Sequence, residues 1–188
     1  MREGLEFARE QLIGKHSVIG AEIGVYRADN AIEMIKEWPE LKELHLVDSY
    51  VSGIIQYRQA ALKIYALRED PQYKRRVYWH VMTHHLAAQR FPNGLFHFAY
   101  IDDDHQFFAV LDALYTWIPK IRTDGVLCGH DRWQGGVNRA IKSFNELYGD
   151  VILNGGEDNR DWWFVVTDEI KDITADAIRG TTLYGLHR

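Results

Sequence analysis

The chain has 188 residues, 46% of them hydrophobic and 26% charged, values that suit one globular domain and exclude a disordered or fibrous protein. The formal net charge of -5 offers no basic surplus for tracking phosphates, so we expect no nucleic-acid partner. A single cysteine, Cys128, excludes an intramolecular disulfide and a cysteine-rich zinc site, and we expect it to be a small buried hydrophobe in a strand.

No apolar run approaches the ~20 residues that a membrane span needs. The first ten residues, MREGLEFARE, also lack the apolar segment of a signal peptide. We therefore expect a cytoplasmic protein that does not bind a membrane.

Helical and strand-like apolar periods alternate along the chain, which indicates a parallel sheet covered by helices. The helical pattern covers, in chain order, 4–13, 28–38, part of 53–68, 84–90, 107–121 and 135–149. Strand-like runs cover 16–24, 43–48, 77–82, 95–102, 124–131, 150–154 and 162–166. The last two strands, joined by the polar stretch 155–161, have the pattern of a hairpin.

This order of elements predicts one Rossmann-like, doubly wound α/β domain over residues 1–188, with its core at about 16–166. The sheet is expected to be mostly parallel and seven-stranded, with an antiparallel terminal hairpin and helices on both faces. Ligands of such sheets bind beyond the carboxyl ends of the strands, so the polar residues at those ends are the candidates for function.

The first strand-to-helix turn, AEIGVYRADNA (21–31), contains Gly24, which permits a tight turn and a close approach of a ligand to the backbone. The turn lacks both the G-x-G-x-x-G fingerprint and the Gly-Lys-Ser/Thr of a P-loop, so a pyrophosphate ligand is disfavoured. Asp48 ends the second strand 24 residues after Gly24, close to the ~20-residue offset of a carboxylate that binds an adenosine ribose. The alternative for Asp48 is a helix N-cap or an exposed acid at a strand end.

Five stretches in order, AEIGVYRADNA, LHLVDSY, FAYIDDDHQFF, GHDR and DWWFVV, resemble the class I S-adenosylmethionine-dependent methyltransferases. More narrowly, they are similar to the small-molecule branch that carries an Ile-Asp-x-x-His strand end followed by Gly-His-Asp. The resemblance implies methyl transfer from S-adenosylmethionine to a small-molecule acceptor, with an oxygen as the expected target. The cofactor contacts that it implies are Glu22, Gly24, Tyr26, Asp48, Ser49 and Asp102.

Two positions depart from the family pattern. Ala28 stands where the second glycine of the first motif is usual, and the turn at 82–86, MTHHL, lacks the usual Gly-Asp-Ser. Both departures raise the alternative of a module that binds the cofactor without transferring its methyl group.

The stretch IDDDH (101–105) places three aspartates behind the fourth strand. Adjacent extended residues point to opposite faces, so the three carboxylates cannot all converge on one ion. We expect Asp102 to be functional, Asp103 to face solvent and Asp104 to cap the helix that follows.

If the fourth and fifth strands are adjacent, the next strand end brings further polar groups to Asp102. The predicted metal ligands for Mg²⁺ or a similar divalent ion are Asp102, His130 and Asp131. The resemblance implies that such an ion binds the hydroxyls of the acceptor. Without a metal, His105 or His130 is the candidate general base, and Asp102, His105 and His130 form the predicted catalytic set. The remaining alternative is a purely structural polar edge.

Trp133 is a candidate wall of the acceptor pocket, whereas we expect Trp162 and Trp163 in the core. His84 and His85 are either polar surface residues or functional residues. We expect the acceptor pocket to be built from variable loops within 49–76 and from the tail after 167. Acid and histidine pairs at strand ends would also suit a metal-dependent phosphoesterase. The sequence determines neither the acceptor nor the oligomeric state, with a homo-oligomer as one alternative.

Overall fold

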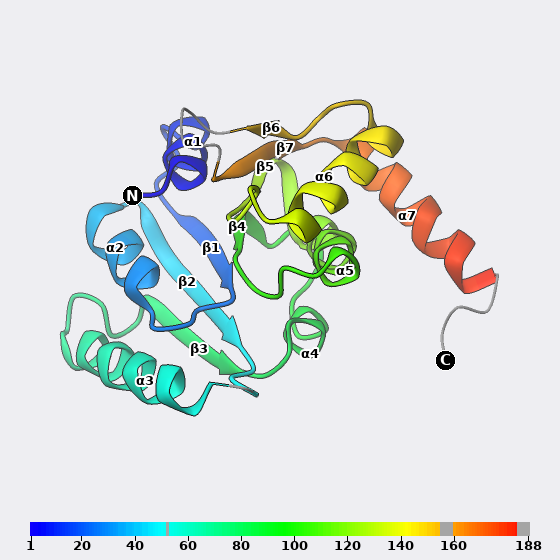
Figure 1. Ribbon diagram of the computed structural model, residues 1–188. Coiled ribbons are helices and arrows are strands. Elements are labelled where there is room, and N and C mark those ends of the chain that lie inside the picture. The colour runs from blue at the N-terminus through cyan, green and yellow to red at the C-terminus, as the bar shows by residue number, and fades with distance from the viewer. Residues whose placement is uncertain (52, 155–159, 184–188) are drawn as a thin grey trace.

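The computed structural model describes residues 1–51, 53–154 and 160–183, which form three layers with a central sheet between two groups of helices (Figure 1). Within this part of the chain the sheet has seven strands in the order β3-β2-β1-β4-β5-β7-β6. The strands are β1 (Val18–Ile23), β2 (Leu41–Asp48), β3 (Val77–Val81), β4 (Phe96–Ile101), β5 (Ile121–Gly129), β6 (Leu153–Asn154) and β7 (Trp162–Val166). Six strands have five to nine residues, whereas β6 has only two.

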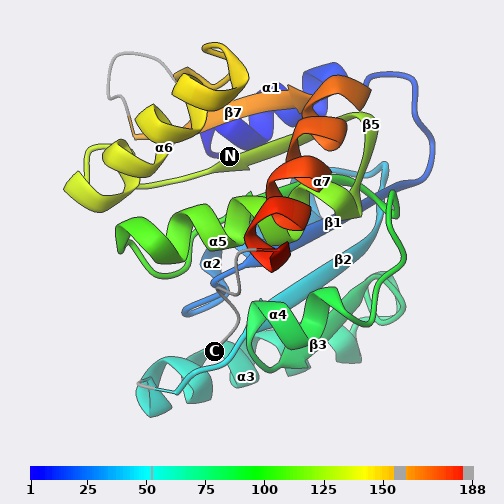
Figure 2. The ribbon, with the colours of Figure 1, turned by 90° about the vertical axis from the view of Figure 1, so that its right-hand side faces the viewer.

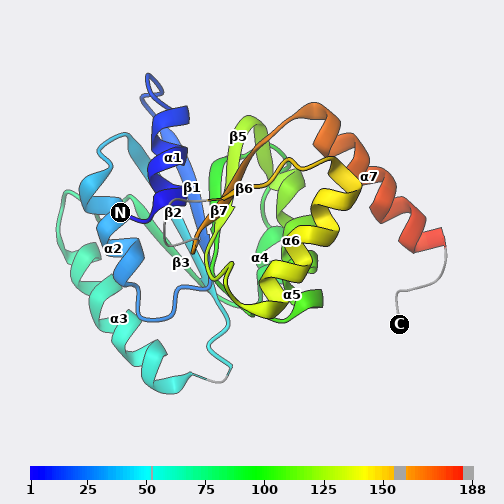
Figure 3. The same ribbon diagram turned by 45° about the horizontal axis from the view of Figure 1, so that its top comes forward.

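Helices connect most of the parallel strands. They are α1 (Glu3–Gln11), α2 (Asp29–Glu37), α3 (Ile54–Glu69), α4 (His84–Ala88), α5 (Phe107–Trp117), the 3₁₀ turn η1 (Ile118–Lys120), α6 (Gly135–Tyr148) and α7 (Asp168–Leu183). In Figure 1 and Figure 3, α1 to α3 lie on one face of the sheet and α4 to α7 on the other. The doubly wound α/β prediction is therefore confirmed.

The strand order reverses between β1 and β4, because the chain leads from β1 outward to β2 and β3 and then returns to the other side of β1. These two strands pair in parallel, with Ile23 opposite Ile101, and β4 pairs with β5, with Ile101 opposite Gly129. The carboxyl ends of β1, β4 and β5 therefore meet at one edge of the sheet. This is the switch point at which ligands of such folds bind.

The terminal hairpin is also confirmed, since β7 pairs antiparallel with both β5 and β6. The middle of its connection, residues 155–159, lies outside the described residues. Because β7 runs against β5, it begins at the edge where β5 ends. The start of β7 therefore belongs to the same cluster of strand ends as the parallel strands.

Core packing explains why β4 is apolar apart from the buried His97. Both faces of this central strand are covered, and all six of its residues are buried. An irregularity of the ladder between Phe96 and Phe98 sends these two rings to opposite faces, where Phe98 stacks on Trp38 and Phe96 packs against Trp117. Cys128 is fully buried, as expected.

The C-terminal half contains one helix to which the sequence assigned no element and one helix that ends earlier than expected. The tail after 167 forms α7, which runs past α5 in Figure 2 and buries Ile170 and Thr174. Asp168 and Glu169 in its first turn favour the helix dipole, and the Thr167 side chain accepts the Ile170 N–H. The helix expected to reach 121 ends at Trp117, because η1 with its proline leads directly into β5.

No helix in the described ranges is long and apolar enough to cross a bilayer.

Candidate active site

Gly24 forms a close-packed turn at the end of β1. Its φ is +86°, and a Cβ there would lie 2.0 Å from the carbonyl oxygen of Asp102. The Asp102 N–H in turn donates to the carbonyl of Ile23 at 2.7 Å. Only glycine fits, because any side chain would collide with backbone that is fixed by the sheet. Ala28, at the second glycine position of the family, has a φ of +64° and is fully buried.

Glu22 is a buried carboxyl group at this turn, with 2% of its surface exposed. Its Oε1 accepts a hydrogen bond of 2.9 Å from Asn30, whereas Oε2 is shielded from solvent without a hydrogen-bond partner among the described residues. Burial raises the pKa of Glu22 to about 8, against the opposing effect of Asn30. An unpaired buried carboxyl oxygen fits a positively charged ligand group, such as the ammonium of the cofactor's methionine portion.

Asp48 fixes the loops beside the Gly24 turn through three hydrogen bonds. Its Oδ2 accepts the N–H groups of Val25 and Tyr26, each at 2.9 Å, and its Oδ1 accepts the N–H of Tyr50 at 2.8 Å. The alternative of a helix N-cap is wrong, since these donors lie in loops. A carboxylate has about four lone-pair sites, so Asp48 retains one for a ligand. Tyr26 is 55% exposed beside it, and Ser49 lines the same cavity.

The ends of β4 and β5 bring acids and histidines together. His105 Nε2 lies 2.7 Å from Asp131 Oδ2 and 3.9 Å from Asp102 Oδ1. These three ligand atoms lie within 4.8 Å of one another. The contact with Asp131 lacks hydrogen-bond geometry, and His105 Nε2 is secluded from solvent with no hydrogen-bond partner in the described part of the chain.

His130 stands at the edge of this cluster. Its Nδ1 is 3.2 Å from Asp131 Oδ1 and 4.0 Å from Asp102 Oδ1, while its Nε2 is 3.7 Å from Asp161 Oδ1. The sequence predicts His130 as the imidazole ligand of a metal, whereas in the structure His105 is the histidine that converges with Asp102 and Asp131. Asp131 holds a φ of +58°, which turns its carboxylate back between the two histidines.

Sequence reasoning missed three residues of the site. The Arg2 guanidinium donates to Asp102 Oδ2 at 2.7 Å and to the Tyr100 hydroxyl at 3.0 Å. Asp161 accepts the Tyr100 hydroxyl at 3.2 Å and the Gly4 N–H at 2.9 Å, and only 3% of it is exposed. The antiparallel hairpin could have indicated Asp161, which immediately precedes β7, whereas no pattern indicates Arg2.

Burial raises the pKa of Asp102, although the positive charges of Arg2 and His130 oppose this effect. Because Arg2 binds Oδ2, the other oxygen of Asp102 faces the histidines. Asp102 therefore offers one oxygen to a further cation.

The side chains next to this cluster differ in how far they are exposed to solvent. Asp103 and Asp104 are exposed, and Asp104 Oδ1 accepts the Gln106 N–H at the start of α5. Trp162 is buried and donates to the His130 carbonyl at 3.1 Å. Trp133 is 62% exposed and lines none of the cavities at the strand ends among the described residues.

Three adjoining cavities follow the strand ends. One of about 430 Å³ extends from Arg2 and Glu22 to Asp131, one of about 250 Å³ is lined by Asp48 and Ser49, and one of about 280 Å³ continues to His84. A larger cavity of about 470 Å³ lies between α1 and α2 and contains none of the clustered acids and histidines described above. We place the site at the strand ends because two buried ligand atoms without a hydrogen-bond partner in the described segments, Glu22 Oε2 and His105 Nε2, lie there.

Comparison with known structures identifies the class of the fold. The chain is similar to CalS11, a TDP-rhamnose 3′-O-methyltransferase of calicheamicin biosynthesis (TM-score 0.65, 13% identity, covering 87% of this chain and 77% of the other). It is also similar to a Corynebacterium glutamicum protein (TM-score 0.64, 12% identity, 87% and 80%) and to a candidate O-methyltransferase from Klebsiella pneumoniae (0.63, 14%, 89% and 81%). The architecture is that of class I methyltransferases.

The sequence family described as Methyltransferase domain matches residues 21–132, more than half of the chain, and the chain belongs to this family. Comparison with curated proteins finds no matching sequence. The protein is an enzyme that transfers methyl groups from S-adenosylmethionine. The phosphoesterase hypothesis is therefore wrong.

Proposed function

We propose that this enzyme methylates a hydroxyl oxygen of a small molecule, which binds beside Asp102, His105 and Asp131 with the help of a divalent ion such as Mg²⁺. The observation that carries the proposal is the convergence of these three ligand atoms within 4.8 Å, next to the cavity of Glu22 and Gly24. Mixed carboxylate and imidazole ligands suit a divalent ion, and a hydroxyl is the acceptor that such an ion activates.

The cofactor residues have distinct tasks in this proposal. The unpaired oxygen of Glu22 accepts a hydrogen bond from the methionine ammonium, and the remaining lone-pair site of Asp48 accepts one from a ribose hydroxyl. Gly24 lets the cofactor approach the backbone. Tyr26 and Ser49 line the cavities beside the ribose position. When bound, the cofactor supplies an electrophilic methyl group on a positively charged sulfur.

Asp102 and Asp131 align the acceptor oxygen with the methyl group, so the transfer is an in-line displacement whose rate comes mostly from positioning. A divalent ion held by these residues would lower the pKa of the acceptor hydroxyl, whose proton would pass to water. Asp102 has its Oδ1 free for this purpose, because Arg2 holds Oδ2. His130 contacts Asp131 and Asp161, and its task is to hold Asp131 in place rather than to bind the ion.

One alternative assigns the proton to His105 without a metal. In that case Asp131 holds the imidazole at Nε2, and the other ring nitrogen, Nδ1, removes the hydroxyl proton. The lack of hydrogen-bond geometry between His105 Nε2 and Asp131 favours the metal, since the base mechanism needs this hydrogen bond to orient the imidazole.

Formation of S-adenosylhomocysteine, measured by mass spectrometry over a panel of hydroxylated acceptors, tests the proposal. The panel includes catechols and, because CalS11 methylates a sugar hydroxyl, nucleotide sugars. We expect product with Mg²⁺, a loss with chelator, and about a 100-fold lower rate for Asp131→Asn. Asp104→Asn is the matched control, because asparagine can accept the same Gln106 N–H and Asp104 is outside the converging group.

Full activity in the presence of chelator, combined with a large loss of rate in His105→Gln, would show that His105 acts as the general base and that no metal is needed. Methylation of amines but of no hydroxyl would overturn the oxygen acceptor.

A further inference from the structure

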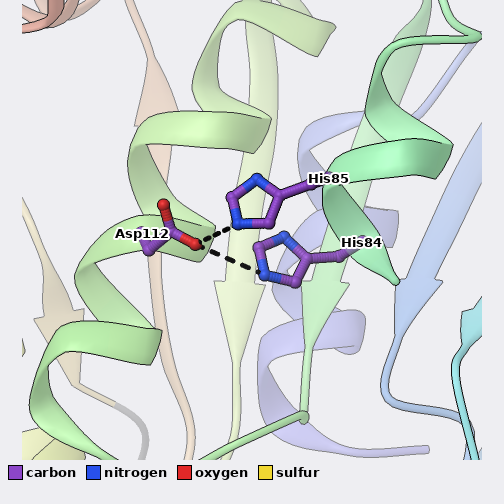
Figure 4. Close-up of side chains that lie close together, drawn as sticks. All are labelled: His84, His85 and Asp112. Atoms are coloured by element: carbon purple, nitrogen blue, oxygen red, sulfur yellow. Dashed lines mark ion pairs between the residues drawn. The ribbon is translucent and has the colours of Figure 1, made fainter. Parts of the chain in front are cut away.

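A second cluster of histidine and carboxylate groups lies away from the converging acids of β4 and β5. His84 and His85 begin α4, and Asp112 projects toward them from α5 (Figure 4). The Asp112 Oδ2 is 2.5 Å from His85 Nε2 and 3.5 Å from His84 Nε2. These ligand atoms all lie within 4.8 Å of one another.

The two imidazole rings come from consecutive residues yet lie side by side, with centroids 4.1 Å apart and planes inclined by 33°. This arrangement turns both Nε2 atoms to the same carboxylate oxygen. Repulsion makes it unfavourable for both rings to carry a charge at this spacing. Burial and the neighbouring His85 also lower the pKa of His84, against the opposing effect of Asp112.

A further residue orients the ligands. Thr116 lies one helical turn after Asp112, and its Oγ1 is 3.4 Å from His85 Nδ1. A hydroxyl that accepts the Nδ1 hydrogen leaves Nε2 free to bind a metal, which is the usual support of a ligating histidine. The cluster thus has three converging ligands and an outer hydrogen bond.

We propose that His84, His85 and Asp112 bind a divalent transition-metal ion of the Zn²⁺ type, which ties α4 to α5 at the rim of the cofactor cavity. Two imidazoles and one carboxylate suit Zn²⁺, Co²⁺ or Ni²⁺ better than Mg²⁺, which prefers oxygen. With three protein ligands the ion keeps open positions for water. The cluster lines the cavity of about 280 Å³ that continues from Asp48 and Ser49. This site is independent of the proposed acceptor site and of its metal.

Cobalt titration followed by the visible d–d bands of Co²⁺ tests the site. The titration uses the full chain carrying Asp131→Asn, which disables the other cluster. We expect one equivalent of Co²⁺ to bind in this background. Asp112→Asn or His85→Gln should abolish the bands at the same concentration, and Thr116→Val should weaken binding by about 10-fold. Asp104→Asn is the control, since this carboxylate lines the same cavity outside the cluster.

Imidazole ¹⁵N NMR of the chain with Zn²⁺ provides a measurement that needs no substitution in the cluster. In the Asp131→Asn chain, shifts of Nε2 confined to His84 and His85 support the site. Absence of Co²⁺ bands in the Asp131→Asn background, or bands that Asp112→Asn leaves unchanged, would overturn it. Methyl transfer is not part of this readout, so failure of the acceptor proposal leaves the result interpretable.

Discussion

The raised pKa of Glu22 predicts how the free energy of unfolding depends on pH. Its carboxyl group is 2% exposed, with a pKa raised by burial to about 8 from an ordinary value of 4.5. The folded chain therefore holds a proton that the unfolded chain has lost between these two values. Because the folded state binds more protons there, the free energy of unfolding falls as pH rises from 4.5 through 8.

The size of this effect follows from the two pKa values. Between about pH 5.5 and about pH 8.5, titration of this one group removes about 3 kcal/mol from the free energy of unfolding. For a domain of this size the loss corresponds to a fall in melting temperature of roughly 6–12 °C. Glu22→Gln removes the titrating group and keeps an oxygen for Asn30. Its stability should lose this component of the pH dependence.

Urea unfolding of both chains at the two pH values measures the difference, and effects of other titrating groups largely cancel in the comparison. A second readout is the affinity for S-adenosylhomocysteine by calorimetry. If the ligand ammonium pairs with ionised Glu22, affinity should rise about 8-fold between about pH 7 and about pH 8.5, with no such rise in Glu22→Gln. Equal pH dependence of unfolding in the two chains would refute the protonated state of Glu22.

Three further substitutions probe the turn and the buried network. Gly24→Ala should unfold the turn or lower the free energy of unfolding by more than about 3 kcal/mol, because its Cβ would meet backbone at 2.0 Å. Gly14→Ala is the control, with φ of +84° and no described atom within 4 Å, and should lower the free energy of unfolding by only about 1–2 kcal/mol in urea. Asp161→Ala should lower the free energy of unfolding by about 2–4 kcal/mol, since it leaves two buried donors unpaired; an exposed control, Asp172→Ala, should change it far less. Asp48→Ala should weaken S-adenosylhomocysteine binding by about 10- to 100-fold in calorimetry, and unchanged affinity would remove its ribose role.

Strand ends are the part of the site that the sequence predicts well. Buried parallel strands read as apolar runs, so the sequence places Asp102 and Asp131 at strand ends, and the pairing of β4 with β5 brings them together. Gly24 is predictable for a related reason, because a tight turn at the switch point demands a residue without a side chain.

The sequence pattern does not predict that Arg2 and Asp161 belong to the site. Arg2 reaches the site from an N-terminal segment through a long side chain, and nothing in the local pattern records that contact. Asp161 depends on the antiparallel direction of β7, which brings the beginning of that strand to the carboxyl ends of the others. The raised pKa of Glu22 is likewise a property of three-dimensional burial rather than of residue type.

The charge balance connects these missed groups with the ligands of the site. Asp102, Asp131 and Asp161 are half-buried or buried within one cluster, and Arg2 supplies one positive charge to them. An uncompensated buried carboxylate is costly, so it either retains a proton or attracts a cation. The pKa of Glu22, raised to about 8 by burial, shows the first response. A sulfonium cofactor with its ammonium, and a divalent ion beside it, would provide the second, and binding of the ammonium should release a proton from Glu22.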